Sequence, residues 1–244
     1  MKLLCFQAHN DDIVIGAGGS IIKLLNKGWE VGYVYITDSR RGTDFSDFEK
    51  NKILRAKEAA SERNFLEVKN FWELGVPNGK LCLIKNFVRE KFKTKITEIV
   101  KEFKPDVALL PSLSEGHPEH RETNRIVLES LKNFQIPILK FILWVYPDIF
   151  QKVHDNSDEV FLVDISKEFE EKISAIRKHK SQVRRRHYDK IAESFNIYLS
   201  LIFKTKFRSA EIFGAENISG KAGKVLMRDL KKTVDLSRVY KKWC

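Results

Sequence analysis

The sequence has few cysteines and no long apolar run. Both absences exclude particular classes of protein. Its 244 residues include only three cysteines, Cys5, Cys82 and Cys244. An odd number of widely spaced cysteines with no CxxC pair excludes a disulfide framework and a cysteine-based zinc site. No stretch approaches the roughly 20 apolar residues of a membrane-spanning helix, and the apolar run at the N-terminus is too short for a signal peptide. We therefore expect a cytoplasmic protein with no transmembrane segment.

Acidic residues are scarce in the C-terminal part of the chain. The first 166 residues carry 24 Lys and Arg against 24 Asp and Glu, whereas the rest of the chain carries 20 against 9. The net charge of +11 therefore lies wholly after residue 166. Such a region suits an anionic substrate, a nucleic acid or an anionic membrane surface, or it is a lysine-rich solvated surface. The arginines at 184–186 have few aromatic neighbours, which disfavours nucleic acid.

Strand-like and helix-like segments alternate along the chain. Hydrophobic residues make up 43% of the sequence, which excludes general disorder. Short β-branched and aromatic runs predict strands at 2–8, 30–37, 69–74, 106–111, 141–146 and 160–163. Helical spacing predicts helices at 20–28, 48–64, 86–103, 119–133 and, as one long charged helix, 167–195. This alternation predicts an α/β fold with a Rossmann-like, mostly parallel sheet and helices on both faces.

The chain shows no internal repeat and no low-complexity linker. We therefore expect a single domain over residues 1–244, with a basic and helical C-terminal portion from about residue 167.

Ionisable side chains gather directly after two of the predicted strands. The groups follow 2–8 and 106–111, and together they comprise His9, Asp11, Asp12, His117, Glu119 and His120. Ligands of an open parallel sheet bind beyond the carboxyl ends of its strands, so both groups should face one crevice. Adjacent carboxylates repel each other when ionised, and a bound cation removes that cost. Imidazole and carboxylate ligands suit Zn²⁺, so the sequence predicts a metal site at this edge.

The remaining histidines, His154, His179 and His187, have no such neighbours. We interpret them as surface residues.

The glycines of Gly16-Ala17-Gly18-Gly19 suggest a rival site. A glycine-rich turn between a strand and a helix can hold a phosphate at the helix N-terminus. However, the third position of a G-x-G-x-x-G fingerprint would fall on Ile21, and the acidic segment lies where a pyrophosphate would approach. We therefore favour close packing of the helix on the sheet over dinucleotide binding.

Several motifs resemble those of the PIG-L (LmbE-like) N-deacetylases. His9-Asn10-Asp11-Asp12 and Gly16-Ala17-Gly18-Gly19-Ser20 resemble the family's H-P-D-D-E and G-x-G-G-T signatures. Gly116-His117-Pro118-Glu119-His120-Arg121 resembles its H-P-D-H-R segment. Weaker matches include Thr37-Asp38, Arg55-Ala56-Lys57-Glu58-Ala59, Asn78-Gly79, Val163-Asp164-Ile165-Ser166 and Ala210-Glu211-Ile212-Phe213. The resemblance covers roughly residues 3–214, and the order and spacing of the motifs make it specific.

The resemblance implies a metal-dependent N-deacetylase built on a Rossmann-like sheet. Its substrate would be an N-acetylated amino sugar of the N-acetylglucosamine type. One divalent metal, usually Zn²⁺, would be held by His9, Asp12 and His120.

The same resemblance implies roles for five further residues. Asp11 would be the general base, and His117 would support the oxyanion or protonate the leaving amine. Glu119 would orient a catalytic histidine. Arg55 and Asn78 would contact hydroxyl groups of the substrate.

Four positions depart from the family pattern. Asn10 replaces a proline, Ile13 replaces a glutamate, Glu119 replaces an aspartate and Asn78 replaces an aspartate. None of them removes an implied metal ligand. An asparagine amide both donates and accepts hydrogen bonds, so recognition of the substrate at Asn78 should differ from that of the family.

Other functions stay open on the sequence alone. A metal-dependent deformylase or another amidohydrolase would use the same residues. A non-enzymatic binder of nucleic acid or of an anionic surface would use the basic region instead. The C-terminal charge favours an anionic substrate, such as a phosphate- or nucleotide-linked amino sugar, and a homo-oligomer is compatible with the sequence.

Overall fold

The chain forms one mixed β-sheet, seen in a computed structural model that describes residues 1–43, 46–143 and 157–236. Its strands are β1 (Lys2–Gln7), β2 (Glu30–Thr37), β3 (Asn70–Val76), β4 (Val107–Pro111), β5 (Ile138–Phe141), β6 (Glu159–Asp164), β7 (Ala210–Glu216) and β8 (Lys232–Asp235). Within the described residues the strand order is β3-β2-β1-β4-β5-β7-β6-β8. The pairs from β3 to β5 are parallel, and those that involve β7 or β8 are antiparallel. The predicted mostly parallel α/β sheet is thus confirmed.

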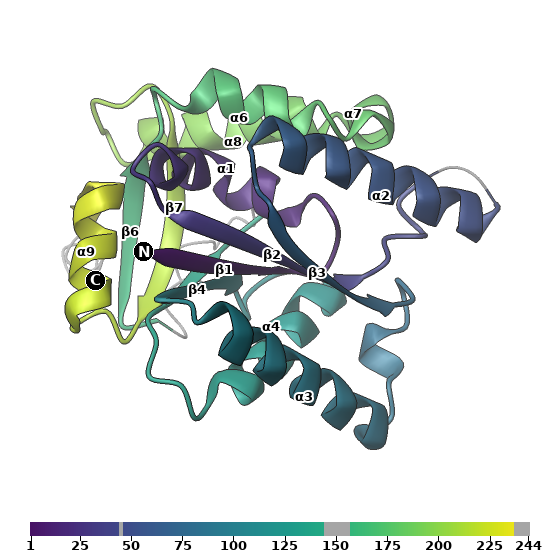
Figure 1. Cartoon of the computed structure of the whole chain (residues 1–244). Coiled ribbons are helices and arrows are strands. Elements are labelled where there is room, and N and C mark those ends of the chain that lie inside the picture. The colour runs from purple at the N-terminus through teal and green to yellow at the C-terminus, as the bar shows by residue number, and fades with distance from the viewer. Residues whose placement is uncertain (44–45, 144–156, 237–244) are drawn as a thin grey trace.

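Helices cover both faces of this sheet (Figure 1). They are α1 (Asp12–Leu25), α2 (Phe48–Phe65), α3 (Asn86–Phe103), α4 (Pro118–Leu131), α6 (Phe169–Ile176), α7 (Lys180–Arg186), α8 (Tyr188–Ile202) and α9 (Lys221–Leu230), with a 3₁₀ turn, η1, at Leu81–Leu83. In Figure 1, α1, α2 and α6–α8 lie on one face and α3 and α4 on the other. None of the described helices is long and apolar enough to cross a membrane.

The two faces are filled by separate apolar clusters because successive side chains of a strand point to opposite sides. In β1, Leu3 and Cys5 belong to the cluster beneath α1 and α6, whereas Leu4 and Phe6 belong to the cluster beneath α3 and α4. The near-continuous apolar sequence of β1 therefore reflects burial on both faces. Cys5 is a core residue, as predicted.

Close packing of α1 on the sheet explains its glycines. A Cβ atom at Gly16 would lie 2.5 Å from Cδ2 of Phe141, and one at Gly19 would lie 2.8 Å from Cβ of Ile165. These positions are inside the helix, which begins at Asp12 rather than at residue 20 as predicted. Glycine is a poor helix former, so tertiary packing overrides local propensity here. The glycines form no phosphate-binding turn.

The C-terminal third differs most from the prediction. The helix expected over 167–195 is three helices. One break lies between Ile176 and Lys180, and the other lies at His187, which adopts a left-handed conformation with φ of 53° between α7 and α8. The portion is also not only helical, since it supplies β7 and β8 to the sheet. The strand predicted at 141–146 begins earlier, at Ile138, and residues 144–146 lie outside the described part of the chain.

Strand order reverses at β1, and this reversal positions the site. The chain runs from β1 outward through β2 to β3, and then returns to place β4 on the other side of β1. The carboxyl ends of β1 and β4 therefore lie side by side where the flanking loops diverge. Open α/β sheets bind ligands at such a switch point.

Candidate active site

A cavity of about 510 Å³ opens at the carboxyl ends of β1 and β4. Its volume lies within the roughly 300–1,000 Å³ that small-molecule sites span. All eight site residues predicted from the sequence line it: His9, Asp11, Asp12, Arg55, Asn78, His117, Glu119 and His120. The fold thus gathers residues from the β1–α1 loop, α2, the turn after β3 and the start of α4.

Three ligand atoms converge within this cavity. Nδ1 of His9 lies 3.2 Å from Nε2 of His120 and 3.4 Å from Oδ1 of Asp12, and the third side of the triangle, from His120 Nε2 to Asp12 Oδ1, is 3.3 Å. Neighbouring ligand atoms of a tetrahedral zinc site with bonds of about 2.0–2.1 Å lie roughly 3.3–3.4 Å apart. The triangle therefore has the size that such a metal requires.

In each of the two imidazoles, the ring nitrogen that points away from the triangle contacts a further carboxylate. Nε2 of His9 lies 3.0 Å from Oε2 of Glu119, whose Oε1 accepts the backbone N–H of Gly79 at 2.8 Å. Nδ1 of His120 lies 3.2 Å from Oε2 of Glu115. A carboxylate on the outer ring nitrogen fixes the tautomer that turns the other nitrogen toward a metal. Glu115 was not among the residues predicted from the sequence, although it follows β4 in the same loop.

The charges of this cluster depend on one another. Burial lowers the pKa of His9, but Asp12 and Glu119 outweigh it and raise that pKa to about 10. Burial likewise lowers the pKa of His120, which Asp12 and Glu115 raise to about 9. Burial raises the pKa of Asp12, yet His120 and His9 hold it well below its usual range.

Protonation of the two histidines does not stabilise the triangle of ligand atoms well. Two protonated rings whose facing nitrogens are 3.2 Å apart repel each other. A cation that accepts both nitrogens and the Asp12 carboxylate removes that repulsion, and its binding releases the ring protons. The residues therefore fit a divalent metal.

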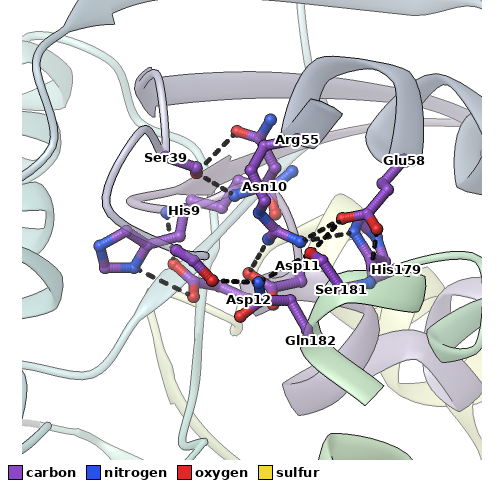
Figure 2. Close-up of polar contacts among 12 residues, drawn as sticks. His9, Asn10, Asp11, Asp12, Ser39, Arg55, Glu58, His179, Ser181 and Gln182 are labelled. Carbon is purple, nitrogen blue, oxygen red and sulfur yellow. Dashed lines mark hydrogen bonds and ion pairs between the residues drawn. The ribbon is translucent and has the colours of Figure 1, made fainter. Parts of the chain in front are cut away.

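Asp11 lies beside the triangle, held by an arginine (Figure 2). Its Oδ1 pairs with Nη2 of Arg55 at 2.9 Å, whereas its buried Oδ2 has no hydrogen-bond partner. Nη1 of Arg55 pairs with Oε2 of Glu58 at 2.8 Å, and Glu58 accepts the backbone N–H of Ser181 at 2.6 Å. This chain of contacts joins α2 to α7 and leaves one oxygen of Asp11 free for chemistry.

His117 is the N-cap of α4, and this position decides its tautomer. Its Nδ1 accepts the backbone N–H of Glu119 at 3.2 Å, so a neutral ring carries its proton on Nε2. Burial, followed by the charges of His9 and His120, lowers the pKa of His117 to about 4. A neutral His117 can donate a hydrogen bond to an oxyanion. His9, His117 and His120 also offer nitrogens within 4.8 Å of one another, but the triangle with Asp12 is tighter and leaves His117 for this role.

The two predicted substrate contacts, Arg55 and Asn78, line the cavity and are also engaged by other residues of the protein. Arg55 is 1% exposed, and its guanidinium forms ion pairs with two carboxylates. Asn78 donates to Oε2 of Glu119 at 2.5 Å and accepts the backbone N–H of Arg41 at 3.1 Å. Both polar atoms of the Asn78 amide therefore contact the protein. These contacts allow Arg55 to position Asp11 and Asn78 to position Glu119, and the predicted contact of both residues with the substrate stays a prediction.

His179 is buried, which corrects its interpretation as a surface residue. It is 1% exposed, and its Nε2 lies 3.3 Å from Oε2 of Glu62. Its Nδ1 lies 3.5 Å from Nη1 of Arg55. No local signal marks it, because its partners come from α2, more than a hundred positions earlier. His187 is exposed, as predicted, and His154 lies outside the described residues.

The chain is similar to known deacetylases. Residues 4–131 match the PIG-L family, described as GlcNAc-PI de-N-acetylase. A diacetylchitobiose deacetylase of Thermococcus kodakarensis is 31% identical over 191 residues, which are 74% of this chain and 70% of that protein.

Solved structures of related proteins have the same fold as this chain. An N,N'-diacetylchitobiose deacetylase from Pyrococcus horikoshii, complexed with an inhibitor, superposes with a TM-score of 0.71 and 25% identity, over 88% of this chain and 84% of that one. The conserved protein TT1542 from Thermus thermophilus has the same fold, with a TM-score of 0.69 and 20% identity, over 87% and 93% of the chains.

The fold, the cavity and these relatives define the chain as a deacetylase, a hydrolase that acts on amide bonds. The protein belongs to the PIG-L family.

Replacement of Arg55 tests the buried network of ion pairs that joins Arg55 to Asp11 and Glu58. Arg55→Met would leave the carboxylates of Asp11 and Glu58 buried without their cation, so we expect the free energy of unfolding to fall by about 3–5 kcal/mol. Urea denaturation measures the loss. Arg208→Met is the control, because the side chains of Arg208 and its partner Glu170 are 58% and 72% exposed, and it should cost about 0–1 kcal/mol. Equal losses would contradict the network.

Proposed function

We propose that the protein is a zinc-dependent deacetylase that removes the acetyl group of an N-acetylated amino sugar of the N-acetylglucosamine type, free or in a phosphate- or nucleotide-linked form. One observation carries the proposal. A metal-sized triangle of His9, Asp12 and His120 lies in the same cavity as Asp11, which has one unpartnered carboxylate oxygen. The relatives named as diacetylchitobiose deacetylases support an N-acetylated sugar as substrate.

The metal would be held by His9, Asp12 and His120, with Glu119 and Glu115 on the outer nitrogens of the two rings. Zinc, when bound, lowers the pKa of a coordinated water toward about 7 and polarises a carbonyl oxygen. Three protein ligands leave a position for water or substrate.

Asp11 acts as the general base in this proposal. Arg55 fixes its Oδ1, so the unpartnered Oδ2 takes a proton from the attacking water. The water oxygen bonds to the acyl carbon, and the carbonyl oxygen becomes an oxyanion. Nε2–H of neutral His117 donates a hydrogen bond to that oxyanion.

The leaving amine then takes its proton from Asp11 as the C–N bond breaks. The products are acetate and a free amino sugar, and Asp11 returns to its ionised form. His117 therefore contributes as a hydrogen-bond donor, and no imidazolium is required at this position.

Release of acid from a panel of N-acyl amino sugars tests the proposal. We expect acetate from N-acetylglucosamine derivatives, loss of activity after treatment with a chelator, and recovery with Zn²⁺. Mass spectrometry identifies the product acid. Formate from N-formyl sugars with no acetate would indicate a deformylase instead, and full activity in chelator would rule out the metal.

Asp11→Asn should separate the base from the metal. The amide cannot accept the water proton, so turnover should fall by roughly 10²–10⁴-fold. The metal content should be unchanged because Asp11 is not part of the triangle. Steady-state kinetics and elemental analysis of the purified protein measure the two quantities. A parallel fall in metal content would show that the roles of Asp11 and Asp12 are wrongly assigned.

Glu115→Gln should weaken the metal site from outside the triangle. Glu115 accepts the backbone N–H of Leu143 and faces Nδ1 of His120, and an amide oxygen can replace only one of its two carboxylate oxygens. We expect zinc affinity to fall by about 10–100-fold. Competition with a chelating dye measures it. Glu129→Gln is the control on α4, where the side chain is 46% exposed. Unchanged affinity in Glu115→Gln would exclude a positioning role.

A further inference from the structure

Arg41 lines the cavity and is held there by contacts that involve no carboxylate. A Cβ atom at Gly79 would lie 2.9 Å from Cζ of Arg41, so the guanidinium packs against a residue that has no side chain. The Cζ atom also lies 5.7 Å from the centre of the Phe48 ring. The backbone N–H of Arg41 is fixed by Asn78 at 3.1 Å. Arg41 is exposed to solvent, but these contacts restrict the position of its guanidinium.

Arg40, the neighbour of Arg41 in sequence, differs because it pairs with two carboxylates. Nη2 of Arg40 pairs with Asp38 at 2.6 Å, and its Nη1 pairs with Glu49 at 3.3 Å. No described carboxylate forms an ion pair with Arg41, although the side chain lines the cavity. Its guanidinium therefore presents donors toward the space that a substrate would enter.

A second arginine lines the same cavity from α7. Arg186 is the last residue of that helix and is exposed, and no ion pair joins it to a carboxylate in the described ranges. Tyr188, two positions later, also lines the cavity. Burial and the charge of Asp11 raise the pKa of Tyr188 to about 12, and the charge of Arg186 opposes this rise. The positive charge of Arg186 thus acts on the cavity.

The carboxylates of the cavity do not neutralise these two arginines. Asp11 is paired with Arg55, and Asp12 and Glu119 contact the imidazoles of the triangle. The charged groups around the triangle are therefore paired with one another, which makes this part of the cavity its floor. Arg41 and Arg186 carry positive charge that no such pair neutralises, and they form its mouth. An acetamide group is neutral and suits the floor, whereas the mouth requires an anion.

We propose that Arg41 and Arg186 form an anion subsite, which binds a phosphate or carboxylate group carried by the amino sugar at a position remote from its N-acetyl group. This inference rests on the proposed deacetylation. Guanidinium groups bind both anions through paired N–H donors, so both chemistries suit the subsite.

Deacetylation of matched sugars tests the subsite. The substrates are N-acetylglucosamine 1-phosphate, its 6-phosphate, the carboxymethyl glycoside and the neutral methyl glycoside. We expect kcat/KM to be at least tenfold higher for one or more charged sugars, and the preference to shrink as salt screens the charges. The phosphate and carboxymethyl compounds distinguish the two sources of charge.

Two variants and one control assign the preference to its residues. Arg41→Gln and Arg186→Gln should each lower kcat/KM for the preferred charged sugar about tenfold more than for the neutral one. Arg184→Gln, on the same helix but outside the cavity lining, should leave the preference unchanged. Equal use of charged and neutral sugars by the unaltered enzyme, or a preference that survives both variants, would overturn the subsite.

A binding measurement keeps this test independent of turnover. Calorimetric titration of the charged and neutral sugars into zinc-loaded Asp11→Asn protein should show tighter binding of the charged form, and Arg41→Gln should abolish the difference. If no sugar releases acetate but the charged one binds more tightly, the proposed reaction fails and the subsite stands. Equal binding of both forms refutes the subsite, whatever the enzyme hydrolyses.

Discussion

Parallel pairing of β1 with β4 is the constraint on which the candidate active site depends. Leu3 pairs with Val107 and Cys5 with Leu109, so the two strands end at the same edge of the sheet. His9 and His120 follow these strands and are 111 positions apart in sequence, yet their ring nitrogens lie 3.2 Å apart. A shift of β4 by one residue would turn its buried side chains to the opposite face. The apolar cores on both faces therefore secure the geometry of the polar cluster.

Burial of so many carboxylates requires partners, and the fold supplies them from several elements. Asp11 is held by Arg55 from α2, and Glu119 receives the backbone N–H groups of Gly79 and Leu81 from the turn after β3. An isolated buried charge is costly, whereas a paired and hydrogen-bonded one is tolerated. Each helix or turn that lines the cavity thus also neutralises or orients a group within it. Stability and function are coupled through these contacts.

Charge is arranged by depth in the cavity. Near the floor, acids and imidazoles balance one another and converge on a position of metal size. At the mouth, Arg41 and Arg186 face the cavity without an acidic partner among the described residues. In the proposed function, such an arrangement would separate the group that reacts from the group that is recognised. Arg186 is the one basic residue of the C-terminal sequence that lines this cavity in the described part of the chain.

The sequence by itself determined the parallel part of the sheet, the helices α2, α3 and α4, and eight of the residues that line the cavity. The bounds of β2 and α3 match the predicted segments, because alternation and helical spacing are local properties. The polar groups after two strands were enough to predict a site, since parallel strands end at a common edge. The single-domain prediction rests on the same local signals.

Only the tertiary structure decided how individual side chains act. It showed that α1 continues through Gly16 and Gly19, where close packing outweighs helix propensity. It placed Glu115 beside His120, buried His179 against α2, and paired Arg55 with two carboxylates. The physical reason is the same in each case. A side chain's charge, tautomer and accessibility are set by atoms a few ångströms away, and those atoms belong to residues that are distant in the chain.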